Sequence, residues 1–336
     1  MNAYPMKKIQ LIQTGGTIAM HSGNGKPELD IDRFTSVLHK EIPELSDIAE
    51  ISTHQLFFED SSDVTPDHWQ KLARHIHKVY NQYDGFVILH GTDTMAYTAS
   101  ALSFSLINIG KPVIFTGSQV PMSNIRSDAH RNVINAVELA TYPVYDVAIC
   151  FNDKLYRGNR ASKMSIGEFD AFASPNYPVL AEVGININLK QTYSRPSSDL
   201  RCNPVFNDQL HVIKLYPGLN PEMLKCLDLS RTKAVIFEAF GSGNFPIEGS
   251  HSMLPFMESC RDAGCHLIIT SQAAYDSVNL NQYKSGRAAK DIGALSAGEM
   301  TMEATVTKTM YLLGCGLSEQ VFKSQFEVNL AGERSQ

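Results

Sequence analysis

Short apolar segments alternate with helix-like segments along the first half of the chain, and this alternation restricts the fold more than any other feature. Four runs have the length and composition of buried strands: residues 9–13, 86–89, 113–116 and 147–151. Three further segments fit helices: 66–83, 94–109 and 132–140. The pattern predicts the α/β class, with a parallel sheet covered by helices on both faces.

A second, shorter α/β series follows a polar stretch in the second half of the chain. Its expected strands and helices are 234–240, 252–263, 266–270, 302–313 and 318–326. The chain has 336 residues, and at roughly 150 residues per domain this length suggests two domains. We therefore predict an N-terminal catalytic α/β domain at 1–190, a linker at 191–210 and a smaller C-terminal α/β domain at 211–336.

The charge balance argues against several classes of partner. Lys and Arg number 29 against 35 Asp and Glu, a net charge of −6. Nucleic acid and anionic lipid surfaces require clustered Lys and Arg, so we expect neither as a partner. No apolar run approaches the roughly 18 residues of a membrane span, and residues 1–13 lack the apolar core of a secretory signal. These features predict a cytoplasmic protein.

The cysteines and histidines do not indicate a metal site. The six cysteines form no Cys-x-x-Cys pair. His75 and His77 lie two apart on an expected helix, so their side chains point in different directions. We expect six reduced thiols and no metal.

Two hydroxyl-rich turns follow two of the expected parallel strands. Residues 14–17 (TGGT) come after the first strand, and residues 90–94 (HGTDT) come after the strand at 86–89. Ligands of open α/β sheets gather at the carboxyl ends of strands. Paired glycines allow the backbone to approach a ligand closely, while the hydroxyls and N–H groups suit nucleophilic catalysis. The alternatives are a plain turn for TGGT and helix capping by Asp93 and Thr94. A dinucleotide site is weakly supported, because Gly-x-Gly-x-x-Gly spacing is missing.

A polar loop and a lysine supply further candidate groups. Residues 59–63 (EDSSD) concentrate acceptors that can hold an ammonium group, although a solvated loop with a helix cap fits the same residues. No Gly-x-Ser-x-Gly elbow is present, so a reacting hydroxyl needs another base. Lys163 can serve if its environment favours the neutral amine, and otherwise it is a surface lysine.

Taken together, these motifs resemble those of the bacterial cytoplasmic (type I) L-asparaginases over essentially the whole chain. The matching segments are TGGTIA at 14–19, DSSD at 60–63, HGTDTM at 90–95, TGSQ at 116–119 and RGNRASK at 157–163. The resemblance implies hydrolysis of the side-chain amide of L-asparagine to L-aspartate and ammonia, without a cofactor. It also implies a homo-oligomer, either a dimer or a dimer of dimers, with active sites at subunit boundaries.

The resemblance also assigns roles to individual residues. Thr17 corresponds to the primary nucleophile, which forms a β-aspartyl ester with the substrate. A second constellation handles the water that resolves this ester, and it consists of Thr92, Asp93 and Lys163. Contacts to the α-amino and α-carboxylate groups of the substrate are implied for Asp60, Ser61, Ser62, Thr92 and Asp93. Backbone N–H groups near Thr92 and the glycine turn are expected to stabilise the oxyanion.

Two departures from the family pattern bear on activity and regulation. The loop after the glycine turn usually carries a tyrosine that assists the nucleophile, but residues 20–32 contain none. Some cytoplasmic relatives also bind asparagine at a second, allosteric site lined by an Arg and a Cys. This chain has Glu238 and Ala273 at those positions, which predicts that the effector site is lost or altered.

Two other functions compete with amide hydrolysis of free asparagine. One is the asparaginase-like subunit of the archaeal tRNA-dependent amidotransferase. Because such subunits carry an extra domain before the glycine turn, which here begins at Thr14, we do not expect this function. The other is a non-catalytic asparagine sensor. The missing loop tyrosine favours a sensor, whereas the retained Thr17, Thr92, Asp93 and Lys163 argue against it.

Overall fold

The computed structural model describes residues 6–16, 38 and 40–335, and it divides the chain into two compact units, Met1–Pro204 and Val205–Gln336. The first unit contains an eight-stranded sheet with the strand order β11-β10-β7-β6-β5-β3-β1-β2. Its parallel strands are β1 (Lys8–Gly15), β2 (Glu50–Glu59), β3 (Gly85–Leu89), β5 (Val113–Thr116) and β6 (Val147–Phe151). The strands predicted at 9–13, 86–89, 113–116 and 147–151 are therefore confirmed.

Three antiparallel strands extend the sheet at one edge: β7 (Lys154–Arg157), β10 (Ala181–Val183) and β11 (Ile187–Leu189). The direction reverses at Asn152 and Asp153, which have φ angles of 44° and 64° and join β6 to β7. Asn and Asp tolerate this left-handed conformation, which a two-residue hairpin turn requires. The predicted parallel sheet is thus mostly parallel, with an antiparallel extension.

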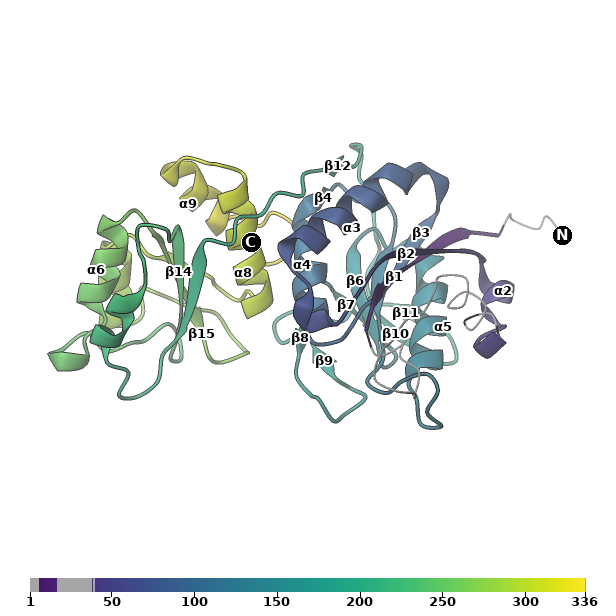
Figure 1. Cartoon of the computed structure of the whole chain (residues 1–336), viewed down its shortest axis with the longest axis horizontal. Helices are drawn as coiled ribbons and strands as arrows, with labels where there is room; N and C mark the ends of the chain where they lie inside the picture. The colour runs from purple at the N-terminus through teal and green to yellow at the C-terminus, as the bar shows by residue number, and fades with distance from the viewer. Residues whose placement is uncertain (1–5, 17–37, 39, 336) are drawn as a thin grey trace. The chain divides into compact units, whose positions relative to one another are not determined.

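Helices cover both faces of this sheet, as predicted. Helices α2 (Leu45–Ile48) and α5 (Ala129–Ala140) lie on one face, and α3 (Pro66–Val79) and α4 (Met95–Ser105) lie on the other (Figure 1). Alternate residues of the strands face opposite sides. Leu11 and Val87 belong to the core beneath α5, whereas the ring of Phe86 stacks 6.3 Å from Tyr80, in the turn that follows α3.

One helix is shorter than predicted because the residues that follow it pair with another strand. Helix α3 begins at Pro66, and Thr65 and His68 form a capping box at its start. The helix predicted at 94–109 ends at Ser105, because β4 (Leu106–Ile107) pairs with β12 (Arg201–Cys202). Part of the segment that we expected to be a linker, 191–210, therefore forms a strand within the first unit.

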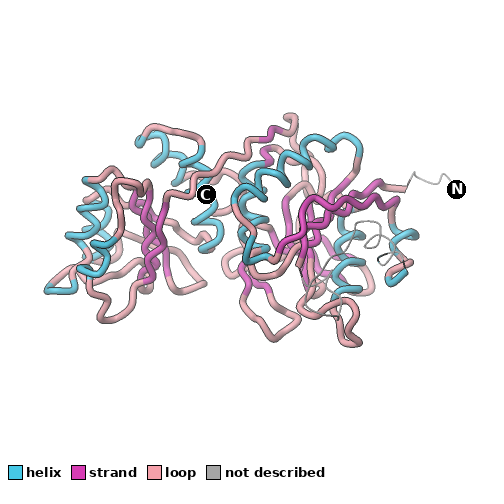
Figure 2. Tube along the Cα trace, viewed as in Figure 1, coloured by secondary structure: helices cyan, strands magenta, loops and turns pink. Residues whose placement is uncertain are grey.

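The second unit is a smaller α/β structure, as predicted. Its four parallel strands have the order β13-β14-β15-β16, with bounds Leu210–Lys214, Ala234–Ala239, His266–Ser271 and Leu295–Ser296. Its helices are α6 (Leu254–Asp262), α7 (Lys284–Asp291), α8 (Met302–Gly314) and α9 (Glu319–Glu327). Figure 2 shows these helices and strands within the second unit. On α8, the buried Lys308 ammonium pairs with the buried carboxylate of Glu333.

Over the described ranges, no helix is long and apolar enough to cross a membrane.

Candidate active site

The strands β1, β2, β3 and β5 end at the same edge of the large sheet. The expected site residues Asp60, Ser61 and Ser62 follow β2, Thr92 and Asp93 follow β3, and Lys163 lies on the short strand β8 (Ser162–Lys163). This convergence depends on glycines. Gly15 and Gly16 have φ angles of 112° and 88°, a region that favours glycine. A Cβ at Gly16 would clash with the backbone of Gly91, and a Cβ at Gly91 would lie 2.7 Å from the Ser61 side chain. The turn after β1 therefore packs directly against the turn after β3.

A lysine, a threonine and an aspartate form a constellation at this edge. The Lys163 Nζ donates to Thr92 Oγ1 at 2.7 Å and to Asp93 Oδ1 at 2.6 Å. The Lys163 side chain is only 14% exposed, whereas that of Asp93 is 65% exposed. Lys163 is therefore not a surface lysine, and its amine contacts the hydroxyl that the sequence singled out.

The turn after β3 does not serve merely as a helix cap. No side chain caps the start of α4. The Asp93 carboxylate contacts Lys163 instead, and the Thr94 hydroxyl donates to the backbone carbonyl of Ser61 at 2.6 Å. The alternative explanation of Asp93 and Thr94 as capping residues is therefore wrong.

Gln119, the last residue of the TGSQ segment, is a site residue for which the sequence predicts no role. The Thr92 hydroxyl donates to Gln119 Oε1 at 3.2 Å. The Gln119 Nε2 donates to the carbonyls of Ser165 and Glu168 at 3.3 Å and 3.2 Å. These two bonds orient the amide so that its oxygen faces Thr92. Thr92 Oγ1 thus accepts from Lys163 and donates to Gln119.

The Asp128 carboxylate holds the backbone at Gln119 in place. Its buried carboxylate accepts the backbone N–H of Gln119 at 3.1 Å and that of Val120 at 3.2 Å. Asn132 donates one N–H to Asp128 and one to the Gly117 carbonyl. The sequence signal for this support was the pair Asp128 and Asn132, four residues apart at the start of α5. The signal was not sufficient, because the backbone that Asp128 binds lies in the turn at Gln119.

The acidic loop forms a compact turn beside this constellation. Asp60 accepts from the Ser62 N–H at 2.9 Å and from the Ser62 hydroxyl at 2.7 Å. These hydrogen bonds hold the pKa of the Asp60 carboxyl below its usual value, so the group stays ionised. Ser61 is buried. Asp60 caps the short 3-10 helix Ser61–Asp63, and a substrate role for these residues remains a prediction.

Two expectations cannot be placed in this geometry. The expected nucleophile Thr17 lies outside the described residues, as does the 20–32 loop that lacks a tyrosine. Among the residues that the structure does describe, no group of three or more His, Cys, Asp or Glu could hold a metal ion.

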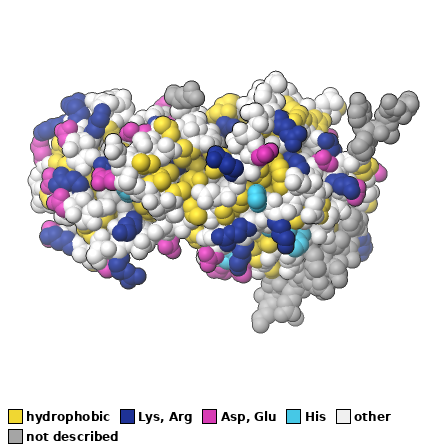
Figure 3. Space-filling model, turned by 90° about the horizontal axis from the view of Figure 1, so that it is seen from above, with side chains coloured by type: hydrophobic (Ala, Val, Ile, Leu, Met, Phe, Trp, Pro, Cys, Tyr) yellow, Lys and Arg dark blue, Asp and Glu magenta, His cyan; other side chains and the backbone are white. Residues whose placement is uncertain are grey.

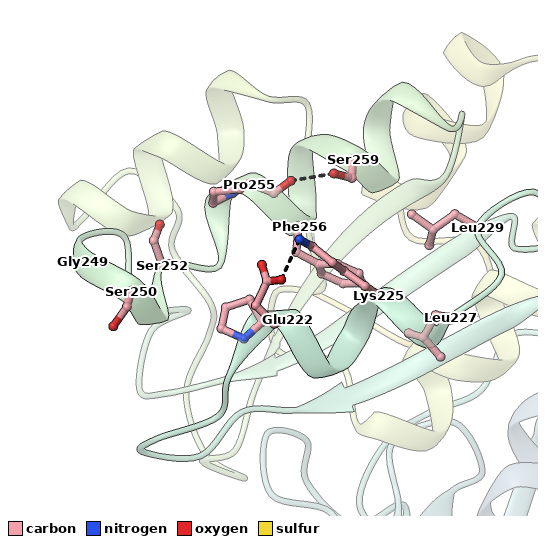
Figure 4. Close-up of a pocket in the computed structure, with 11 residues that line it drawn as sticks. Glu222, Lys225, Leu227, Leu229, Gly249, Ser250, Ser252, Pro255, Phe256 and Ser259 are labelled. Atoms are coloured by element: carbon pink, nitrogen blue, oxygen red, sulfur yellow. Dashed lines mark hydrogen bonds and ion pairs between the residues drawn. The ribbon is translucent and has the colours of Figure 1, made fainter.

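A pocket in the second unit, drawn in Figure 4, has a different character. Apolar residues such as Leu227 and Phe256 line it together with several serines. Its charged residues Glu222 and Lys225 pair with each other at 2.7 Å, and the Ser259 hydroxyl donates to a helix carbonyl. Lys225 thus pairs with a carboxylate, whereas Lys163 contacts a threonine hydroxyl as well as a carboxylate.

An α/β fold that presents hydroxyl groups and a hydrogen-bonded lysine at the carboxyl ends of its strands defines an enzyme suited to hydroxyl-dependent hydrolysis. The comparisons with known proteins make this specific. The family model "Asparaginase, N-terminal" matches residues 8–195, and the family model "Glutaminase/Asparaginase C-terminal domain" matches residues 209–326. The chain belongs to the asparaginase family, and it is an amidohydrolase.

Individual relatives agree with this assignment over their whole length. The chain is 40% identical to L-asparaginase 1 of Escherichia coli K12, covering 97% of this chain and 98% of the relative. The structure of L-asparaginase I from Vibrio cholerae matches with a TM-score of 0.88 and 38% identity, covering 98% and 100%. The thermostable L-asparaginase from Thermococcus kodakarensis matches with a TM-score of 0.89 and 33% identity, covering 98% and 99%.

Proposed function

We propose that the chain hydrolyses the side-chain amide of L-asparagine to L-aspartate and ammonia through a threonine nucleophile and a covalent β-aspartyl-enzyme intermediate. The observation that carries this proposal is the contact of Lys163 Nζ with Thr92 Oγ1 at 2.7 Å, next to the glycine turn that leads into Thr17. An amide is a poor electrophile, and a covalent intermediate divides its hydrolysis into two easier steps.

The first step forms the ester. The Thr17 hydroxyl attacks the amide carbon, the C–N bond breaks, and the leaving nitrogen takes up a proton and departs as ammonia. In the second step water attacks the ester carbon, the bond to Thr17 breaks, and Thr17 recovers its proton. We assign the handling of this water to Thr92, with Lys163 and Asp93 controlling its proton, because Lys163 contacts both of them.

The substrate is a small zwitterion, so its site needs an acceptor for ammonium and donors for carboxylate. The ionised Asp60 supplies an acceptor, and Asp93 supplies a second, partly exposed one. Ser61, Ser62 and Thr92 are assigned to the carboxylate, although the hydroxyls of Ser62 and Thr92 must then turn from Asp60 and Gln119, to which they donate in the structure. These contacts follow from the family resemblance, and the convergence of the two turns at Gly91 and Ser61 supports them.

We further infer a homo-oligomer, a dimer or a dimer of dimers, that acts in the cytoplasm. All six cysteines are free, which suits a reducing compartment. On the face shown in Figure 3, basic and acidic side chains are interspersed. That distribution does not favour binding of tRNA, whose phosphates require a basic surface. The oligomeric state is tested by light scattering of the purified protein.

The decisive experiment measures ammonia release from L-asparagine over a wide concentration range for the wild type, Thr17→Ala and Thr92→Val. Release that Thr17→Ala abolishes supports both the reaction and the nucleophile. Release that survives Thr17→Ala but not Thr92→Val moves the nucleophile to Thr92. A folded wild-type protein that asparagine stabilises against heat without any ammonia release is instead a sensor, and it contradicts the proposal.

A further inference from the structure

Three buried side chains form a hydrogen-bonded chain behind the turn that carries Thr92. The indole Nε1 of Trp69, on α3, donates to Thr98 Oγ1 on α4 at 3.1 Å. Thr98 Oγ1 lies 3.0 Å from His90 Nε2, and His90 Nδ1 lies 2.7 Å from the Gly91 carbonyl oxygen. The chain therefore runs from one helix through a second helix to the backbone of the turn after β3.

The direction of each bond follows from the groups at the two ends. Indole N–H can only donate and a carbonyl oxygen can only accept. His90 Nδ1 must therefore carry a proton to reach the Gly91 oxygen. In a neutral ring Nε2 then carries none, so the Thr98 hydroxyl, which accepts from Trp69, donates its own proton to His90 Nε2. A neutral His90 in this arrangement is therefore the Nδ1–H tautomer.

The surroundings of His90 maintain this state. The side chain is 1% exposed, and its ring packs edge-on against Phe115 with 5.9 Å between centroids. Burial lowers the pKa of His90 to about 4. Because its ring is held by contacts from β5, α4 and the turn itself, the imidazole is a rigid anchor rather than a group that exchanges protons with substrate.

The bond from His90 orients one peptide unit. In a trans peptide the C=O and the N–H point in opposite directions. When the Gly91 carbonyl is held toward the buried imidazole, the N–H of Thr92 is directed away from it. Among the described residues, no acceptor is hydrogen-bonded to the Thr92 N–H. A fixed N–H without an internal partner, beside Thr92 Oγ1 and Lys163, is suited to a developing oxyanion.

We propose that Trp69, Thr98 and His90 are positioning residues that hold the Gly91–Thr92 peptide so that the Thr92 N–H faces the oxyanion of the tetrahedral intermediates. The inference rests on the proposed function for its catalytic consequence. Such an arrangement acts mainly on kcat, because the negative charge on the oxygen develops only in the transition state.

The test compares three substitutions of buried threonines. Thr98→Val keeps the shape but removes the hydroxyl, whereas Thr98→Ser retains it. Thr309→Val is the matched control, because Thr309 is also fully buried in a helix, but it lies in the second unit and its hydroxyl donates to a helix carbonyl four residues earlier rather than to a histidine. We expect Thr98→Val to lower kcat about 10- to 100-fold with KM changed less than about threefold. Thr98→Ser and Thr309→Val should stay within about threefold of wild type.

A second measurement does not depend on variants that fold or on catalysis. Nitrogen-15 NMR of histidine-labelled wild-type protein at pH 7 should show a neutral His90 protonated at Nδ1. A His90 protonated at Nε2, or a Thr98→Val enzyme with wild-type kcat, would overturn the positioning role. Absence of asparaginase activity in the wild type contradicts the proposed function instead, and the NMR signature still tests the hydrogen-bonded chain.

Discussion

Lys163 makes the contact on which the chemistry depends most. Its Nζ contacts both Thr92 Oγ1 and Asp93 Oδ1, so removing the amine leaves the Thr92 hydroxyl without a partner for proton transfer. We predict that Lys163→Met lowers kcat by about 10²-fold or more, the usual contribution of an acid–base group. Steady-state ammonia release measures the effect.

Lys154→Met is the matched control for this substitution. Lys154 also pairs with an aspartate, Asp170, at 2.7 Å, but both side chains are substantially exposed. Exposed ion pairs contribute little to stability, so kcat of Lys154→Met should stay near that of the wild type. Equal losses in the two variants would show that charge near the sheet, rather than the contact with Thr92, determines the rate.

His90 predicts a pH dependence of stability. Its pKa is about 4 in the folded protein and 6.5 in the unfolded chain, because burial disfavours the charged ring. The stabilisation is complete above pH 6.5 and is lost as the pH falls from 6.5 toward 4, since the unfolded state takes up the proton first. At pH 5 the His90 contribution to the free energy of unfolding should be lower by about 2 kcal/mol.

Urea unfolding at pH 7 and pH 5 measures the combined change. Histidines 75 and 266, whose pKa values are also lowered to about 4 by burial, act in the same direction. Following the His90 signal by NMR isolates its own contribution. A His90 resonance that titrates near pH 6.5 in the folded protein would contradict the prediction.

At the scale of elements, the site depends on how closely the turns after the strands approach each other. Gly16 has a φ of 88° and no room for a Cβ beside Gly91. We predict that Gly16→Ala lowers the free energy of unfolding by at least about 1–3 kcal/mol from backbone strain alone and abolishes activity. Urea unfolding and ammonia release measure these effects.

Gly167→Ala is the control at the same scale. Gly167 lies between β8 (Ser162–Lys163) and β9 (Phe172–Ala173), has no positive φ, and has no atom within 4 Å of an added Cβ. Its stability should change by no more than about 0.5 kcal/mol. A Gly16→Ala variant as stable as Gly167→Ala would show that the two turns do not pack as closely as the structure indicates.

At the scale of the whole molecule, the second unit bears on regulation. The family resemblance places Glu238 at the position of an allosteric arginine, and in the structure the Glu238 carboxylate forms an ion pair with Lys214 at 3.2 Å. An acidic side chain that already holds a lysine offers poor binding for a second asparagine carboxylate. We therefore predict hyperbolic saturation of the rate with asparagine, and a sigmoidal curve from steady-state assays would contradict it.

The local predictions succeeded where one segment contained its own signal. The Phe86–Leu89 run and the helix beginning at Pro66 are recognisable without any partner. Strand β2 was missed because, as an edge strand, it is only partly buried on both faces and lacks a clear alternation. The hairpin at Asn152 and Asp153 was not predicted, because two polar residues do not by themselves indicate that three antiparallel strands follow.

The sequence by itself determined the α/β class, the two series of strands and helices, and the motifs that carry the hydroxyls and the lysine, because each is a property of neighbouring residues. Only the tertiary structure decided which of these groups meet. Lys163 contacts a hydroxyl 71 residues away, and Thr92 donates to Gln119 27 residues further along the chain. Such contacts depend on strand order and on the close approach of glycine turns. No local pattern encodes that geometry.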